Sequence, residues 1–185
     1  AQLGFRSIEE AVGHVEVLTT KKAVEHWKAD GLDLSPILHR VTTDGPLHCV
    51  TTQDHGLGAK LDNSLIAQAA PALADGTPVR ITGTVSNVDR TVGTMLGNAV
   101  TKATVGEGLP EDTIDVTLVG TGGQSFGAFL PRGVTLRLIG DTNDYLGKGL
   151  SGGRLIVRPD EASRFVPAEQ IIAGNVIGYG ATSGE

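Results

Sequence analysis

The chain has 185 residues, a formal net charge of -6 and a single cysteine, Cys49. An acidic chain lacks the basic surface that holds nucleic acid or anionic membranes, so neither is expected as a partner. One cysteine can form neither an internal disulfide nor an iron–sulfur cluster. No apolar run approaches the ~20 residues of a membrane helix. A cytoplasmic location is therefore expected.

The beginning of the chain is predicted to form short helices. Ser7 and Glu10 have the spacing of a capping box, in which each side chain satisfies a free N–H group at a helix N-terminus. Apolar residues then recur at helical spacing, which predicts a helix over Ile8–Leu18. A second short helix is expected over Lys21–Asp30, with Gly31 as its stop.

A third helix is expected to begin at Asp62 or Asn63. Pro71 should end or kink it, because proline cannot donate the helical hydrogen bond. The sequence therefore divides into a helical linker region at 1–40, a helix-and-loop connector at 41–78 and a different kind of structure at 79–185.

From Val79 onward the sequence has the pattern of strands and turns, with almost no room for helices. The expected strands are the short β-branched runs at 79–81, 114–119, 134–139, 155–157 and 171–172. Glycines and small polar residues separate them, so this part of the chain is expected to be mainly β.

Glycine is the strongest signal, with 26 residues in the chain. A G-x-x-x-G element occurs four times, at Gly93 and Gly97, Gly123 and Gly127, Gly149 and Gly153, and Gly180 and Gly184. Repeats at this spacing indicate stacked units rather than one closed sheet, and glycine allows the tight corners of a parallel β-helix. An irregular antiparallel sandwich is the alternative. We expect these eight glycines to be structural.

Two short motifs have the letters of functional sites but the wrong context. Residues 123–127 read G-x-S-x-G, but Pro131 and Gly133 follow where a nucleophile elbow needs a helix, and the last histidine is His55. Residues 147–152 read G-x-G-x-x-G, but a strand follows where a dinucleotide site needs a helix. Both are interpreted as turns.

Metal sites are not predicted either. Asp141, Asn143 and Asp144 suggest a calcium loop, but Tyr145 and Leu146 stand at the fifth and sixth positions, so a turn is the better interpretation. The five histidines are scattered without ligand spacing, and Cys49 is expected to be a small buried apolar residue. No catalytic, cofactor-binding or metal-binding residue is predicted.

Long segments of the chain resemble the large subunits of glutamate synthases. GFRSIEEAVG at 4–13 resembles the end of their FMN-binding domain, and HWKADGLDLSPIL at 26–38 resembles the linker that follows it. DHGL at 54–57 and LDN at 61–63 continue this likeness. The glycine segments at 87–97, 123–129 and 143–153, and the pair at 174–176 and 179–185, are similar, in order, to the four repeats of the family's GXGXG domain.

The resemblance implies a right-handed, single-stranded parallel β-helix preceded by a short helical linker region. In such enzymes this domain is not catalytic; it supports the amidotransferase and FMN domains and the ammonia channel between them. The whole enzyme makes glutamate from glutamine and 2-oxoglutarate. Its FMN and iron–sulfur cluster would be bound elsewhere, and the expected partners are the remaining domains, with an NADPH-dependent small subunit as a further candidate.

The chain also departs from the family pattern. Ala1 stands where the family's amidotransferase has its nucleophilic cysteine, and the family's β-helix runs beyond Glu185. We therefore expect a part of the enzyme, truncated at its C-terminus, with no activity by itself and with NADPH, NADH or ferredoxin equally open as electron donor. The alternatives are a stand-alone subunit of another redox complex, such as formylmethanofuran dehydrogenase or N-methylglutamate synthase, and a carbohydrate-active β-helix enzyme.

Overall fold

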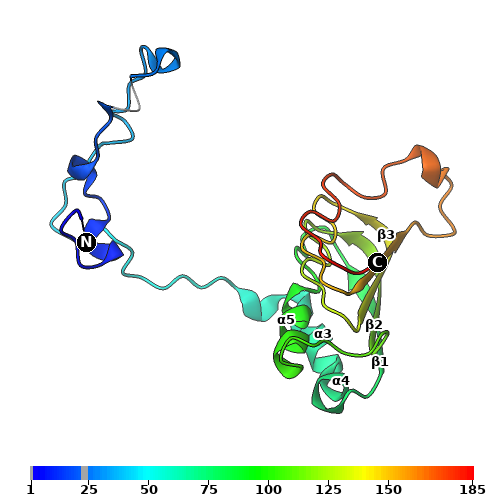
Figure 1. Ribbon diagram of the computed structural model, residues 1–185. Helices are drawn as coiled ribbons and strands as arrows, with labels where there is room; N and C mark the ends of the chain where they lie inside the picture. Colours follow the sequence, from blue (N-terminus) through cyan, green and yellow to red (C-terminus); the bar gives the residue numbers. More distant parts are fainter. Residues whose placement is uncertain (1, 22–24) are drawn as a thin grey trace. The chain divides into compact units, whose positions relative to one another are not determined.

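Figure 1 shows the computed structural model, which describes residues 2–21 and 25–185. The chain divides into two compact units, Ala1–His55 and Gly56–Glu185. The three-part division at residues 40 and 78 stays a prediction. Within the part of the chain that the structure describes, no helix is long and apolar enough to cross a bilayer.

The first unit begins with a helix shorter than the one expected over Ile8–Leu18. α1 spans only Ile8–Ala11, and a 3-10 turn over Val15–Val17 follows it. The predicted cap is confirmed, because Ser7 Oγ accepts a hydrogen bond from the backbone N–H of Glu10 at 3.2 Å. The helix ends early because Gly13 adopts φ +79°, a left-handed conformation that commonly follows a helix C-terminus.

The remainder of this unit has little regular structure. Of the helix predicted over Lys21–Asp30, residues 22–24 lie outside the described part, and its end forms only a 3-10 turn at Trp27–Ala29. The prediction that Cys49 is buried is wrong: its side chain is exposed, and its Sγ donates to the carbonyl oxygen of Thr51 at 3.2 Å. None of the described residues of this unit is buried, so there is no core for the thiol to join.

The second unit opens with helices. After a 3-10 turn at Leu57–Ala59, α3 spans Leu61–Gln68 and α4 spans Ala70–Asp75. Pro71 lies in the first turn of α4, so the predicted interruption of the helix at this residue is confirmed.

Four parallel strands follow, in the order β1-β2-β3-β4. They span Val79–Val85, Ile114–Gly122, Val134–Thr142 and Arg154–Arg158. Each strand pairs in register with the next, so the expected parallel arrangement is confirmed and the antiparallel alternative is wrong. No further strand forms at 171–172, where Ala173 makes only an isolated bridge with Thr142.

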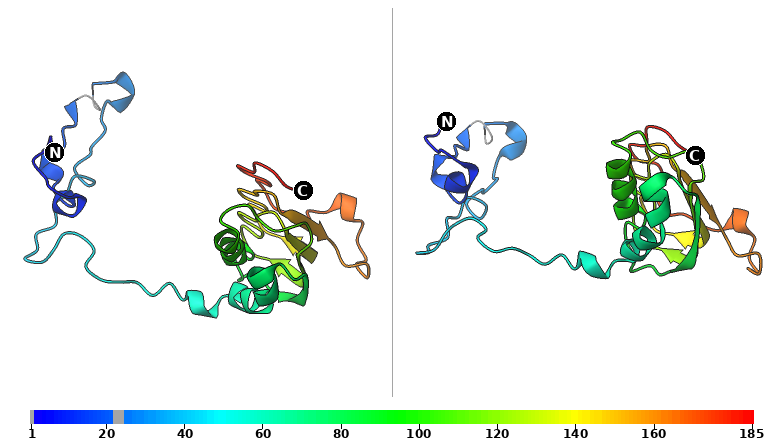
Figure 2. Two further views of the ribbon diagram at one scale, coloured as in Figure 1. Left: turned by 60° about the horizontal axis from the view of Figure 1, so that its bottom comes forward. Right: turned by 90° about the horizontal axis from the view of Figure 1, so that it is seen from below.

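A third helix in this unit corrects the expectation that the second half has almost no helix. α5 spans Thr94–Ala103, directly after the first strand and its turn. Leu96 and Val100 lie on one face of it and are fully buried in the core, which accounts for a helix at this place. In Figures 1 and 2 the helices gather on one side of the unit, and the orange segment between β4 and the C-terminus projects from another side.

The core consists of columns of equivalent side chains from successive strands. Ile81, Val116 and Leu136 occupy matching positions of β1, β2 and β3, and at most 3% of each is exposed. Phe126 and Leu130 from the turn after β2 belong to the same core and are also fully buried. Removing such apolar area from water is the main source of stability for this unit.

Candidate functional site

The turns that follow the strands stack on one another through their own ladder of backbone hydrogen bonds. The N–H of Thr91 donates to Gln124 O at 2.9 Å, and the N–H of Ser125 donates to Asp144 O at 2.8 Å. The N–H of Tyr145 continues this series to Asn175 O at 2.9 Å. These N–H donors therefore belong to equivalent positions of successive turns.

The same column is marked by an unusual backbone conformation. Thr91, Ser125, Tyr145 and Val176 have φ values of 57°, 61°, 62° and 60°. Left-handed φ is uncommon for residues other than glycine and costs free energy. Four such residues in one column show that stacking of the turns, rather than local preference, determines this geometry.

Two residues further along each turn, the stacked position is always glycine. The N–H of Gly127 donates to Val92 O, that of Gly147 to Phe126 O, and that of Gly178 to Leu146 O, at 2.8 to 2.9 Å. With Gly93, these residues have φ between 64° and 93°. A Cβ atom on Gly127 would clash with the Leu155 side chain, which would have to move to make room for it.

The glycines of the predicted repeat do not all occupy equivalent places. Gly93 and Gly127 belong to the glycine column described above, whereas Gly149 stacks on Phe129, whose N–H donates to Lys148 O. Gly97 lies inside α5. Of the remaining four, Gly123 packs on the carbonyl oxygens of Asn87 and Asp89. Gly153 and Gly184 lie side by side, and Gly180 faces open space.

Another column of equivalent turn residues runs through the interior. Val92, Phe126 and Leu146 occupy equivalent positions in the first three turns, with 2%, 0% and 7% exposed. Ile177, the matching residue of the last turn, is 61% exposed. The apolar column therefore reaches the surface at the last turn.

A buried carboxylate links α3 to the first turn. Asp62 is 3% exposed, and its carboxylate accepts hydrogen bonds from the backbone N–H groups of Gly93, Met95 and Leu96 at 2.7 to 3.2 Å. These are free donors at the N-terminus of α5, so Asp62 caps that helix from another element. Burial raises the pKa of Asp62, and the three N–H groups act in the opposite direction. Sequence spacing gave no signal for this contact.

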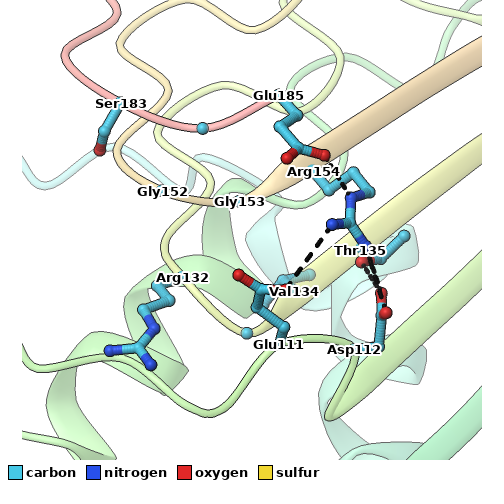
Figure 3. A pocket seen from close by; sticks show the side chains of 12 residues that line it. Glu111, Asp112, Arg132, Val134, Thr135, Gly152, Gly153, Arg154, Ser183 and Glu185 are labelled. Carbon is cyan, nitrogen blue, oxygen red and sulfur yellow. Dashed lines mark hydrogen bonds and ion pairs between the residues drawn. The ribbon is translucent and has the colours of Figure 1, made fainter.

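A polar hollow of the second unit surrounds Arg154, the first residue of β4 (Figure 3). Its Nε lies 2.8 Å from Glu185 Oε2, and its Nη1 lies 3.1 Å from both carboxylate oxygens of Asp112. Thr135 Oγ1 donates to Asp112 Oδ1 at 2.6 Å. The Thr135 hydroxyl, and next Arg154, hold the pKa of Asp112 below its usual value.

This hollow has a volume of about 350 Å³. Glu111 adds a longer contact, 3.7 Å from Arg154 Nη2, so three acidic side chains surround one guanidinium. Arg132 lies at the opposite side of the hollow in Figure 3. Asp112 precedes β2, Thr135 lies in β3 and Arg154 begins β4, so the Arg154 network joins successive strands at this corner.

The short motifs singled out from the sequence, at 123–127 and 147–152, lie in the turns between strands. Ser125 lies in a turn with φ 61°, and the chain continues into further turn rather than into a helix. All histidines lie at or before His55, outside this unit. Among the described residues no group of three or more histidine, cysteine, aspartate or glutamate side chains could hold a metal ion. Asp144 instead accepts hydrogen bonds from the backbone N–H and side-chain amide of Asn175.

Comparison with known proteins identifies a family and several similar proteins. A model of the GXGXG motif family matches residues 62–185. Over its full length the chain is 47% identical to "Glutamate synthase [NADH]" of Saccharomyces cerevisiae, 49% identical to the protein of the same name from Schizosaccharomyces pombe, and 44% identical to "Glutamate synthase [NADPH] large chain" of Bacillus subtilis. It spans 9% of the first two proteins and 12% of the third.

Proposed function

The chain belongs to the GXGXG motif family, and from this premise we propose that it is a structural, non-catalytic domain of a glutamate synthase. The observation that carries the proposal is the extent of the likeness. The family model begins at residue 62, whereas the glutamate synthases match the whole chain, including the segment before it. A GXGXG domain used in a different protein has no reason to share that preceding segment.

We propose a right-handed, single-stranded parallel β-helix for residues 79–185. Two features support this architecture: four strands paired parallel and in register, and a second ladder that joins the turns between them. One strand and one turn would make one coil, and each coil would bury its apolar face against the next. The buried columns Ile81, Val116, Leu136 and Val92, Phe126, Leu146 fit this construction.

The proposed role is to hold the amidotransferase and FMN domains in place around their ammonia channel. The complete enzyme would make glutamate from glutamine and 2-oxoglutarate in the cytoplasm. The short span of the chain relative to its relatives supports this division of labour, because most of each relative lies outside the matched part. The partners are then the remaining domains of the large subunit, with an NADPH-dependent small subunit as a further candidate.

The cofactors of the resembled family do not fit the residues of this chain. A single cysteine cannot hold an iron–sulfur cluster, which takes several thiolates. Gly147 and Gly149 have the letters of a phosphate loop, but their N–H groups already donate to Phe126 O and Tyr179 O. We therefore propose that FMN and the cluster are bound elsewhere in the polypeptide.

A stand-alone subunit of another redox complex is the second candidate, because the family match over 62–185 alone is compatible with it. Formylmethanofuran dehydrogenase and N-methylglutamate synthase are examples of such complexes. The size of the native polypeptide separates the two, since a subunit would be little longer than the family match and a glutamate synthase domain far longer.

The first experiment is to detect peptides of this chain in its source cells and measure the mass of the polypeptide that carries them. A large polypeptide that forms glutamate from glutamine supports the proposal; a free subunit of roughly the present length contradicts it. In parallel, the purified 185-residue chain is assayed for glutaminase activity and flavin absorbance. Stoichiometric flavin or measurable glutaminase activity in that chain would show that the domain is not merely structural.

A further inference from the structure

One coil of the second unit contains an extra segment that the others do not need. In β3, Gly140 and Asp141 alone connect Ile139 to Thr142. In the next coil Arg158 pairs with Ile139 and Ala173 with Thr142, so residues 159–172 replace those two positions. We call residues 159–172 the excursion; it is the orange segment in Figure 1.

The excursion departs from the sheet without disturbing it. Pro159 cannot donate to the ladder, which explains why the chain leaves the sheet at that point. The chain rejoins the stack where the N–H of Thr142 donates to Ile172 O at 2.9 Å. The coils on either side stay in register, so their packing gives no reason for the excursion to exist.

The excursion carries apolar side chains that no other described part of the unit covers. Phe165, Val166 and Ile171 are 45%, 55% and 85% exposed. A hollow of about 430 Å³ lies at its base, where Val119 and Ile139 from the strands contribute apolar surface. Exposed apolar surface beside a hollow of this size is typical of a place where another protein surface docks.

The rim of this hollow is acidic. Asp141 and Asp160 line it, and Glu169 lies exposed on the excursion. Glu161 is paired with Arg158 at 3.4 Å, which leaves Arg164 as the basic residue within the excursion to oppose the remaining acids. Complementarity of charge therefore favours a partner that presents basic groups to this hollow.

We propose that the excursion and its hollow are a docking surface for another segment of the same large polypeptide, one that presents an apolar side chain flanked by lysine or arginine. This inference rests on the proposed function, since it takes its partner from the enzyme outside this chain. The matched part is only 9 to 12% of the length of the relatives, so most of such a polypeptide lies outside this chain and is available to supply the docking segment.

Thiol labelling tests the proposal in the complete polypeptide. Ile171→Cys is introduced at the most exposed apolar position of the excursion, and Val105→Cys, at a residue 90% exposed after α5, is the matched control. Peptide mass spectrometry follows the rate of maleimide addition in the complete polypeptide and in the 185-residue chain. Docking should slow the reaction at position 171 by on the order of tenfold in the complete polypeptide and leave position 105 unchanged.

Charge reversal gives the second arm. Asp160→Lys, added to Ile171→Cys, should restore fast labelling in the complete polypeptide, because it repels the proposed basic partner. Equal rates in the two forms of the protein, or equal slowing at both positions, would overturn the docking surface. So would protection of position 171 that appears in the 185-residue chain as its concentration rises, which would indicate a second copy.

The glutamate-forming activity of the complete polypeptide separates the two proposals. An active enzyme with an unprotected position 171 would refute the docking surface and leave the proposed function standing. A protected position in a polypeptide that forms no glutamate from glutamine would refute the proposed function.

Discussion

Asp62 and Met95 lie on different helices, and a hydrogen bond of 2.7 Å from the Met95 N–H to Asp62 Oδ2 joins them. With its further bonds to Gly93 and Leu96, Asp62 supplies the cap that α5 lacks in its own sequence, where the N-cap is Gly93. The start of α5 is thus determined by a residue of α3.

Replacing Asp62 should destabilise the second unit strongly. Asp62→Asn keeps one acceptor oxygen but turns an amide group toward backbone donors, so we expect a loss of about 2 kcal/mol in the free energy of unfolding. Urea unfolding followed by circular dichroism measures it. Glu107→Gln, the same exchange at an exposed acid beyond α5, should change the free energy by less than about 0.5 kcal/mol. Equal effects of the two substitutions would contradict the capping role.

Asp112 should make stability sensitive to acid. Its pKa is lower in the folded chain than in the unfolded one, so its contribution is present above the unfolded value, about 3.9, and is lost as the pH falls through the folded value. Lowering the pH from 5 to 3, roughly the window of this titration, lowers the urea midpoint of the natural chain. The midpoint of Asp112→Asn should decrease less over the same range. Asp141→Asn, at an exposed carboxylate in β3, is the control. An unchanged pH profile in Asp112→Asn would refute this assignment.

Glycine is required at position 127 for two reasons that a pair of variants can separate. Gly127→Ala meets left-handed φ and a clash with the Leu155 side chain, so we expect a loss of about 3 kcal/mol. Gly180→Ala meets a similar φ of 69° in open space, so only the conformational cost of about 1 kcal/mol should appear. Chemical denaturation of both variants gives the difference. A Gly180→Ala variant as unstable as Gly127→Ala would mean that packing against Leu155 contributes nothing.

The interior column predicts a gradient of sensitivity along the stack. Phe126→Ala removes a side chain with no exposed surface and should cost about 4 kcal/mol. Ile177→Ala acts at an equivalent position that is 61% exposed and should cost less than about 1 kcal/mol in the 185-residue chain. Thermal or urea unfolding of the two variants tests this. Comparable losses would show that Ile177 is as well packed as Phe126 and would refute the gradient.

The strands were predictable because their residues are locally distinctive. The runs that begin at Val79, Ile114 and Val134 each start a strand at that residue, since β-branched residues bounded by glycine favour extended structure. The run at 171–172 has the same composition but is no strand. There the chain is returning from the excursion, and its place in the fold depends on contacts that composition does not encode.

The missed helix and the register of the turns have a common cause. Leu96 and Val100 have helical spacing, but Gly93 and Gly97 fit the G-x-x-x-G repeat equally well, and that repeat predicts a turn where α5 forms. The structure aligns the turns by backbone hydrogen bonds instead of by glycine spacing. Thr91 and Tyr145 show why the sequence could not reveal this, because neither residue type indicates a left-handed backbone.

The return of the chain at Ala173 has a consequence for protein engineering. The corner between Arg158 and Ala173 already accommodates residues 159–172 without shifting the pairing of β3 with β4. A foreign loop grafted between these two residues would begin and end at fixed points of a rigid frame. The corner is therefore a natural insertion point for peptide display, where the length and composition of the guest can vary while the host sheet keeps its alignment.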